Sequence, residues 1–330
     1  MLDKLSIQPQ GYSERLQRKV VYAGQATGFD TAVASLKELS DLEINKTAIR
    51  RISLKHGKEA GEYLNGIEVT DAKAEYIISQ TDGSMVPITS TNDSDLITPS
   101  QDKRKNKKRI FKEIRLNYAK NNRGQSYYNA DFVYANDIKP FIYDSLTKTG
   151  YSKGNTKLYA IGDGAPWIYN TYYGIDTSVN YTIDYYHLEE KLADVAPSII
   201  EKTKWSDINV LREKSWTKAL GKKIINGGIE AVYQQMCNHE KSYLFYDVTT
   251  YISNRPNQFN YPLLESLDLP IGSGIVEGGH KSIIQKRLIK SGSGWKTDNA
   301  KNIVNLRLLN ANNQWNEYWD YQNTKHKLCA

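Results

Sequence analysis

The chain has little cysteine and no long apolar segment. Its 330 residues include two cysteines, Cys237 and Cys329, which lie far apart and outside any C-x-x-C or Cys/His spacing that builds a zinc site or a disulfide framework. No apolar run is long enough to cross a bilayer, and the segment from Met1 to Tyr12 has no apolar core typical of a signal peptide. We therefore expect a cytoplasmic protein with no membrane partner.

Two further absences narrow the chemistry. None of the five histidines begins an H-x-x-R pattern, which weakens the case for a recombinase that uses one of the 24 tyrosines as nucleophile. The G-S-G segment Gly272–Gly274 lacks the Gly-Lys-Ser/Thr ending of a P-loop, so it does not indicate nucleotide hydrolysis. We interpret it as the turn that orients the helix after it.

The composition is that of a soluble protein with a full-sized core. Charged residues make up 25% of the chain, hydrophobic residues 39% and aromatic residues 11%. The net charge of +7 and a pI of about 9.0 favour an anionic partner, nucleic acid first among them. A basic enzyme without a polyanionic partner is the alternative.

The first part of the chain has helical periodicity. Apolar residues recur at helical spacing between residues 13 and 66, with Asp30 and Asn45 as candidate N-caps. The second helix carries Arg50, Arg51 and Lys55, so the segment has the outline of a helix-turn-helix with this helix in the DNA major groove. A plain αα-hairpin packed on the rest of the protein is the competing interpretation.

The central part alternates between strand and helix patterns. Residues 75–89 suggest a hairpin that turns at Asp82-Gly83. A polar loop follows, whose basic end, including Lys105, Lys107 and Lys108, is either a solvated run or a phosphate contact. Further along, the patterns predict strands at 110–120, directly before Asp163 and at 178–183, and helices at 131–150, 186–267, around Glu277 and at 298–318. This order indicates an α/β fold with a mixed sheet.

Three acidic residues are candidates for metal chemistry. Asp82 and Asp163 each follow a strand pattern and precede a glycine, and Glu277 lies on a later helix. Carboxylates that converge in this way suit Mg²⁺, which prefers oxygen ligands, with Mn²⁺ as a substitute. Because D-G is one of the commonest turn dipeptides, either aspartate taken alone would more often be part of a structural turn.

Cationic residues surround the last of these acids. Lys281, Lys286, Arg287 and Lys290 follow Glu277 on one helical segment and suit contact with a DNA backbone. Trp295, in a polar S-G-S-G-W-K context, is a candidate to stack on an unpaired base.

The segments GSGIVEGGHKSIIQKRLIKSGSGW, IGDGAPWI, QTDGSMVPI and IDYYHLEEKL together resemble blocks of insertion-sequence DDE transposases of the ISKra type, related to the ISLre group. The resemblance covers most of the chain. It implies an RNase H-like fold with the metal triad on Asp82, Asp163 and Glu277. A D-x-x-H feature of the family matches Asp184 and His187, and the resemblance places His187 near the reacting strand.

The organisation that follows has four parts: a helical DNA-binding region at 1–70, the first part of an RNase H-like core at 71–185, a helical insertion at 186–269, and the last part of the core at 270–330. The expected activity is Mg²⁺-dependent cleavage and strand transfer on double-stranded DNA by a homodimer or higher oligomer. An inactive or regulatory DNA-binding protein derived from a transposase, or an RNase H-like nuclease that cuts without joining, are the alternatives.

Overall fold

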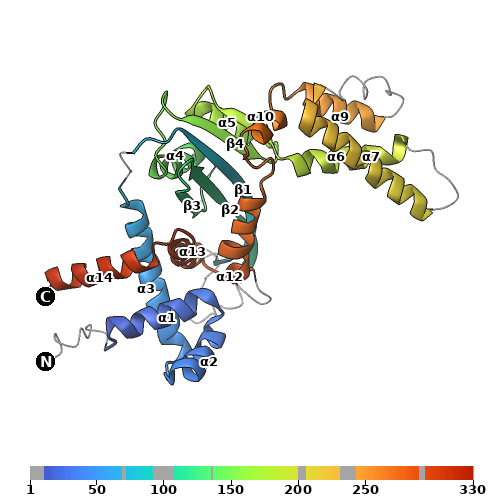
Figure 1. Ribbon diagram of the computed structural model, residues 1–330. Helices are drawn as coiled ribbons and strands as arrows, with labels where there is room; N and C mark the ends of the chain where they lie inside the picture. Colours follow the sequence, from blue (N-terminus) through green and yellow to red (C-terminus); the bar gives the residue numbers. More distant parts are fainter. Residues whose placement is uncertain are drawn as a thin grey trace.

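One mixed β-sheet lies at the centre of the protein (Figure 1). The computed structural model describes residues 11–68, 72–91, 107–134, 137–199, 206–230, 243–289 and 294–329. The strands are β1 (Tyr76–Thr91), β2 (Lys107–Asn121), β3 (Ser126–Asp131), β4 (Lys157–Gly162) and β5 (Asn180–Ile183). They form a five-stranded sheet of order β3-β2-β1-β4-β5, in which β1 is antiparallel to β2 and parallel to β4. This sheet confirms the predicted fold class, an α/β fold with the mixed sheet of an RNase H-like core.

Helices cover both faces of the sheet and extend from it on two sides. Those that precede the sheet are α1 (Glu14–Ala26), α2 (Phe29–Ser40) and α3 (Lys46–Asn65). Those between the strands and shortly after them are α4 (Ile138–Lys148), α5 (Pro166–Ile175), α6 (Tyr185–Ile199), α7 (Ser206–Gly227), α9 (Tyr243–Ser253) and α10 (Tyr261–Ser266). The last are α11 (Gly274–Gly279), a π-helical segment (His280–Gln285), α12 (Lys286–Leu288), α13 (Thr297–Ala311) and α14 (Trp315–Cys329).

The alternation of side chains along β1 separates the two faces of the sheet. Ile77 points to the face covered by α4 and α5, where Ser79 and Thr81 each hydrogen-bond to the Tyr172 hydroxyl at 2.7 Å. Gln80 points the other way, toward the loop before α11. Asp82, two residues further on, therefore lies on the α11 face.

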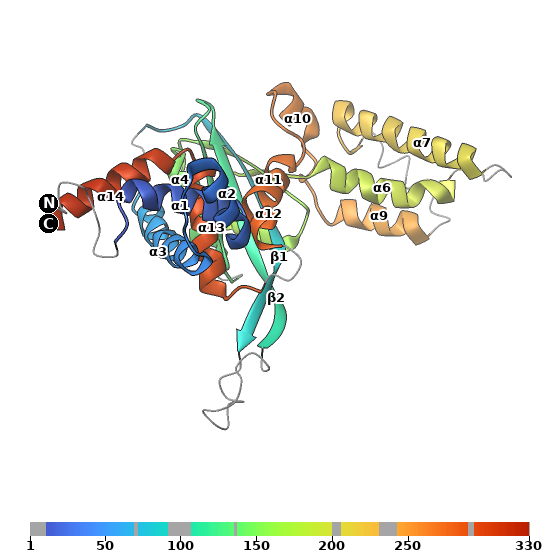
Figure 2. The same cartoon turned by 90° about the horizontal axis from the view of Figure 1, so that it is seen from below.

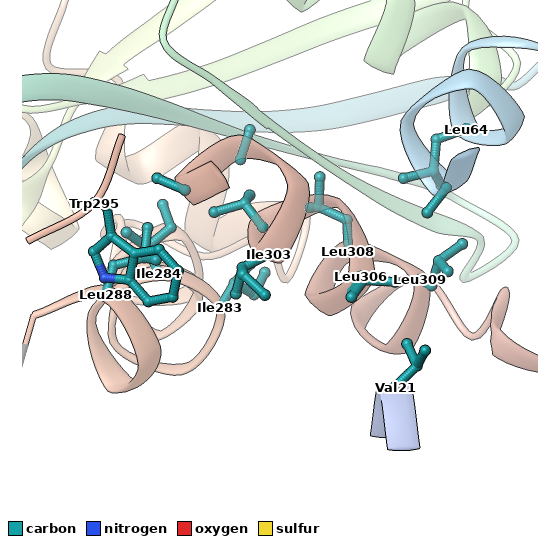
Figure 3. Close-up of a cluster of buried hydrophobic side chains, with 14 of the residues drawn as sticks. Val21, Leu64, Ile283, Ile284, Leu288, Trp295, Ile303, Leu306, Leu308 and Leu309 are labelled. Carbon is teal, nitrogen blue, oxygen red and sulfur yellow. The ribbon is translucent and has the colours of Figure 1, made fainter. Parts of the chain in front are cut away.

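One hydrophobic core lies between the sheet and helices α4 and α5. A second hydrophobic core joins the N-terminal helices to the last helices of the chain (Figure 3). The predicted cap is present, because the Asn45 side chain accepts a hydrogen bond from Ala48 N at 2.8 Å; the cap predicted at Asp30 is wrong, since α2 begins at Phe29 after Gly28. Helices α3 and α13 approach so closely that a Cβ on Gly57 would lie 2.3 Å from Asn302 O. Helices α1–α3 thus share a core with α13, and the predicted domain boundaries stay a prediction.

The helices between β5 and α11 form an extension. In Figures 1 and 2, α6, α7 and α9 lie side by side and project away from the sheet. This agrees with the helical pattern predicted for residues 186–267, apart from described residues that are not helical, among them 228–229 and 254–260. None of the described helices combines the length and apolar character needed to cross a membrane.

The predicted hairpin at Asp82-Gly83 is wrong, because β1 runs through both residues as one continuous strand. Asp82 pairs with Leu116 and Gly83 with Arg115 across the antiparallel ladder with β2. The two strands continue together beyond the helices as a ribbon (Figure 2). Both residues pair with β2, and Gly83 N donates to the Asp82 side chain at 2.7 Å, so no turn forms here, which the local dipeptide does not reveal.

Two smaller predictions also need correction. The segment 131–150 is not one helix, since β3 ends at Asp131 and α4 begins at Ile138. The helix expected over 298–318 is interrupted between α13 and α14, where Asn313 adopts a left-handed conformation with φ of 57°.

Candidate active site

Asp82 and Asp163 come from neighbouring parallel strands. The β1–β4 register ends with Gln80 opposite Ile161. Asp82 lies two residues beyond Gln80 on β1, and Asp163 lies two residues beyond Ile161, directly after the end of β4. The Asp163 carboxylate acts electrostatically on Asp82, so the structure places these two predicted residues at the same edge of the sheet.

A tight turn fixes Asp163 at the end of β4. Its Oδ1 accepts a hydrogen bond from Ala165 N at 2.7 Å. Gly164 has a φ of +87°, which side chains other than glycine rarely adopt. Here the D-G dipeptide does form a turn, and the carboxylate keeps its second oxygen outside that turn.

Gln80 holds the helix that carries Glu277. Its buried amide donates from Nε2 to Gly272 O at 3.0 Å and accepts from Val276 N at 3.1 Å through Oε1. Glu277 follows directly, in the first turn of α11. One side chain of β1, two residues before Asp82, therefore positions the loop and helix start that carry the third predicted acid.

Asp184 fixes the same loop from the other side. The carboxylate is fully buried, and it accepts hydrogen bonds from Tyr186 N at 2.6 Å, from Ser273 N at 2.6 Å and from the Ser273 hydroxyl. The Ser273 hydroxyl also lies 3.0 Å from Glu277 Oε1. A hydroxyl has one proton, so it can donate to only one of these two carboxylates at a time.

Asp184, His187 and Glu277 form a group that a metal ion could bind. One ligand atom from each lies within 4.8 Å of the others. His187 and Glu277 are half-buried and reach solvent, whereas Asp184 is buried with both oxygens already hydrogen-bonded. Asp184 therefore suits a supporting role better than that of a direct ligand.

The electrostatics of Asp82 indicate a carboxylate that lacks a strong cationic partner. Burial raises the pKa of Asp82 and the Asp163 carboxylate raises it further, against the opposing effects of His280, the Gly83 amide and His187. In the described part of the chain, no lysine or arginine forms an ion pair with Asp82, Asp163 or Glu277. A bound divalent cation would favour the ionised carboxylates at this edge.

His280 lies directly beside Asp82, in the π-helical segment one turn after Glu277. Its Nε2 is 3.8 Å from Asp82 Oδ2, and both ring nitrogens are buried without a hydrogen-bond partner. Burial lowers the pKa of His280, although the carboxylates of Asp82, Glu113 and Glu277 act in the opposite direction. The imidazole thus lies against Asp82, whose carboxylate and backbone both raise the pKa of the ring, against the effect of burial.

The predicted acids meet through two overlapping pairs. Asp82 lies beside Asp163, and Glu277 lies beside His187, which itself acts on Asp82. Among the described residues, Asp82 and Asp163 are not in the group whose ligand atoms all lie within 4.8 Å, which contains Asp184, His187 and Glu277. The assignment of Asp82, Asp163 and Glu277 as one metal triad therefore stays a proposal.

The residues predicted to contact DNA lie in several places. Arg50 and Arg51 are exposed on α3, and Lys55 is half-buried there, 3.8 Å from Glu59. Lys108 is exposed on β2, and Lys281 and Lys286 are exposed after Glu277. Lys105, Lys290 and the side chain of Lys107 lie outside the described residues.

Arg287 and Trp295 correct the prediction of a DNA contact at these two positions. Arg287 is 3% exposed and donates from Nε and Nη2 to Gly24 O at 3.2 Å. Its guanidinium lies between the rings of Phe29 and Trp295, 4.7 and 4.8 Å from their centroids. Trp295 is 9% exposed and packs beside Leu288 and Ile284 (Figure 3). Both side chains hold the second core together instead of facing solvent.

Sequence patterns missed the side chains that support the acids. Gln80 lies within a strand pattern, and Ser273 within a turn motif that predicted only the direction of α11. Two positions held a usable signal: a polar residue at the inward position of a buried strand, and a histidine three residues after Glu277 on the same helix.

Comparison with known proteins gives one structural match. No protein-family model and no curated protein matches the chain. Among solved structures, the Drosophila P element transposase strand transfer complex matches with a TM-score of 0.36 and 10% identity, over 95% of this chain and 82% of that chain. A similarity of this size carries no inference about activity.

Proposed function

We propose that this chain is a DDE transposase, an enzyme that cleaves DNA strands and transfers their 3′ ends with the help of Mg²⁺ or Mn²⁺. The observation that supports the proposal is that Asp82 and Asp163 lie close together at one edge of the sheet, while Glu277 lies beside His187, which acts electrostatically on Asp82. These half-buried acids on different elements lie near a solvent-reaching histidine, and they suit chemistry better than folding, because carboxylates that lose part of their hydration without a cationic partner destabilise a fold.

The donor set fits a hard divalent cation. Asp82, Asp163 and Glu277 would supply carboxylate oxygens, the ligands that Mg²⁺ prefers. The Ser273 hydroxyl can satisfy only one of the two carboxylates it faces, which leaves a Glu277 oxygen available. When bound, such a cation lowers the pKa of an attacking water or 3′-hydroxyl and stabilises the leaving oxygen.

The chain's own residues would orient these ligands. Gln80 and Asp184 hold the loop before α11 from opposite sides, so the direction of Glu277 is set before any ligand binds. His187, whose side chain is 41% exposed, lies where it can contact the DNA strand being cut. His280 limits the movement of the Asp82 carboxylate on its buried side.

Double-stranded DNA is the proposed partner. The net charge of +7 supports a polyanion, and the cations we assign to it are Arg50, Arg51, Lys55, Lys105, Lys107, Lys108, Lys281, Lys286 and Lys290. We assign the ISKra-type family, and a homodimer or higher oligomer on DNA, to the same proposal. Light scattering of the protein–DNA complex measures the oligomer directly.

A cleavage assay tests the activity. The substrate is duplex DNA with the sequences that flank the gene, incubated with Mg²⁺ and with Mn²⁺. We expect Asp163→Asn and Glu277→Gln to remove cleavage while DNA binding persists. Asparagine at 163 keeps the oxygen that accepts from Ala165 N, so the turn is preserved. Asp268→Asn is the matched control, since Asp268 is exposed in a left-handed conformation that asparagine tolerates.

Three outcomes separate the alternatives. Strand-transfer products from the wild type support the transposase, whereas cleavage without joining identifies a nuclease. DNA binding with no metal-dependent cleavage identifies a regulatory or inactive protein. Wild-type cleavage by Asp163→Asn refutes the assigned site.

A further inference from the structure

The Asp163-Gly164 turn lies against the end of α9, in the helical extension (Figure 1). Arg255, two residues after α9 ends, donates from Nη2 to Gly164 O at 3.4 Å and from Nη1 to Tyr251 O at 3.2 Å. Tyr251 belongs to α9, and its hydroxyl oxygen occupies the space that a Cβ on Gly164 would need. Arg255 lies 91 positions beyond Gly164, so these contacts join the extension to the residue directly after Asp163.

Neighbouring side chains fix the orientation of the Tyr251 ring. The Arg255 guanidinium lies 3.9 Å from the ring centroid, and the Lys191 amine of α6 lies 4.7 Å from it. The Phe259 ring packs on Tyr251 in a T-shaped arrangement, with the centroids 6.4 Å apart. Cations over an aromatic ring are attracted by its electron-rich face. Contacts from α6 and from the segment after α9 therefore keep the hydroxyl at Gly164.

The Tyr251 hydroxyl has a proton to donate and no acceptor for it. Its oxygen is buried and forms no hydrogen bond within the part of the chain that the structure describes. Burial raises the pKa of this hydroxyl, Arg255 lowers it and the Asp163 carboxylate raises it further. A buried hydroxyl without a partner destabilises a fold, and phenylalanine would fill nearly the same space. The presence of tyrosine at this position therefore calls for a reason other than packing.

The Asp163 carboxylate is the acceptor that best explains this hydroxyl. Its Oδ1 accepts from Ala165 N at 2.7 Å, which leaves the second oxygen outside the turn. Carboxylates that bind metals are themselves oriented by hydrogen bonds from neighbouring groups. The Tyr251 hydroxyl can supply such a bond, because it is fixed at the residue next to Asp163 and lies within the electrostatic influence of that carboxylate.

We infer that Tyr251 and Arg255 are positioning residues for Asp163. Arg255 holds the turn through Gly164 O, and the Tyr251 hydroxyl donates to the Asp163 carboxylate in its metal-binding orientation. The inference rests on the proposed function, because it takes Asp163 to be a metal ligand. It makes the end of α9 a part of the active site.

Replacement of Tyr251 by phenylalanine removes the hydroxyl and keeps the ring with its two cationic contacts. We expect Tyr251→Phe to weaken Mn²⁺ binding about tenfold or more, the usual effect of losing a group that orients a metal ligand. The free energy of unfolding without metal should stay the same or rise, because a buried unpaired hydroxyl is lost. Calorimetric titration of the full chain with Mn²⁺ and urea unfolding measure the two quantities. A hydroxyl that only fills space would leave the Mn²⁺ affinity unchanged.

Ser53→Ala is the matched control. The Ser53 hydroxyl on α3 is also buried without a hydrogen-bond partner among the described residues, and it occupies the space of a Cβ on Gly24. Its neighbour Ile52 belongs to the second core, so the hydroxyl lies away from the Asp163 turn. Its removal should leave Mn²⁺ affinity as it is in the wild type.

Replacement of Arg255 by lysine separates positioning from DNA contact. Lysine keeps the positive charge but lacks the planar fork that donates to Gly164 O and Tyr251 O together. We expect Arg255→Lys to weaken Mn²⁺ binding about tenfold. The salt dependence of its affinity for a duplex with gene-flanking sequence should not change. Loss of DNA affinity with wild-type Mn²⁺ binding would assign Arg255 to DNA and overturn its positioning role.

The results also separate this inference from the proposed function. Wild-type Mn²⁺ affinity in both Tyr251→Phe and Arg255→Lys would overturn the inference, and the proposed function would stand if Asp163→Asn still lowers that affinity. Weaker Mn²⁺ binding by both variants of a protein that never cleaves DNA would support the inference and refute the proposed reaction. Wild-type Mn²⁺ affinity in Asp163→Asn would refute the metal site and the inference with it.

Discussion

Replacing Asp184 with asparagine distinguishes a supporting carboxylate from a metal ligand. Asp184 is fully buried and accepts three hydrogen bonds, two from Ser273 and one from Tyr186 N. Asparagine has nearly the same shape but only one acceptor oxygen. In either amide orientation its NH₂ group faces at least one backbone N–H that has lost its acceptor.

The size of the effect follows from these contacts. Hydrogen bonds to a charged group contribute about 1.5–3 kcal/mol each, and a buried donor left unsatisfied costs about 1–3 kcal/mol. Removal of a buried charge offsets part of this loss. We expect Asp184→Asn to lower the free energy of unfolding by about 3 kcal/mol in the absence of metal.

The assay compares stability with metal affinity. Urea unfolding followed by circular dichroism gives the first quantity, and Mn²⁺ titration by calorimetry gives the second. Asp176→Asn is the matched control, because Asp176 is also buried and accepts from Ser178 N at 2.9 Å, Ser178 Oγ at 2.7 Å and the Tyr151 hydroxyl at 2.8 Å. It should lose similar stability with no change in Mn²⁺ affinity.

Glu277→Gln provides the opposite comparison. Its side chain is half-buried and reaches solvent, so it should lose Mn²⁺ affinity with little loss of stability. If Asp184→Asn is as stable as the wild type but binds Mn²⁺ as weakly as Glu277→Gln, Asp184 is a direct ligand and the reasoning is refuted.

Three further substitutions test the fold and the site. Gly57→Ala should destabilise the protein by about 1–3 kcal/mol through overpacking, because the new Cβ would meet Asn302 O. Thermal unfolding measures this loss. The control is Gly174→Ala on α5, where the nearest atom is a lysine amine 3.7 Å away, and it should be neutral or stabilising. Burial raises the pKa of Tyr172 to about 12; the unfolded chain loses this proton near pH 10, so stability should fall between pH 10 and about 12. Tyr172→Phe should show a shallower loss across that window in urea titrations, and an equal slope would contradict the assignment. Gln80→Leu should lower the free energy of unfolding by about 2 kcal/mol, because it leaves Gly272 O and Val276 N unpaired. It should also weaken Mn²⁺ binding. Unchanged Mn²⁺ affinity would show that the two Gln80 hydrogen bonds do not position Glu277.

Local sequence signals were sufficient for much of the fold. The strand before Asp163, the strand that ends at Ile183 and the N-cap of α3 at Asn45 were each predicted and are present. Each depends on neighbours within a few residues, such as a side chain that caps its own helix. The mixed sheet also followed, because the order of strands and helices restricts the possible topologies.

The site needed contacts between distant segments. The Asp-Gly dipeptide forms a turn at Asp163-Gly164 but continues as a strand at Asp82-Gly83, where β2 pairs with the backbone. The tertiary structure also gives two cationic residues after Glu277 different surroundings. Lys281 is exposed, whereas Arg287 is buried against the rings of Phe29 and Trp295. A residue's type therefore did not decide its role.

The sequence by itself determined most of the helices and strands, the positive charge and the acids available for chemistry, because these depend on composition and on short-range periodicity. Only the tertiary structure decided that Gln80 and Asp184 hold the loop before Glu277, that His280 lies against Asp82, and that β1 and β2 extend as a ribbon. Hydrogen bonds between residues 89 to 196 positions apart leave no local pattern in the chain, since their energy is realised only when the sheet and the last helices pack together.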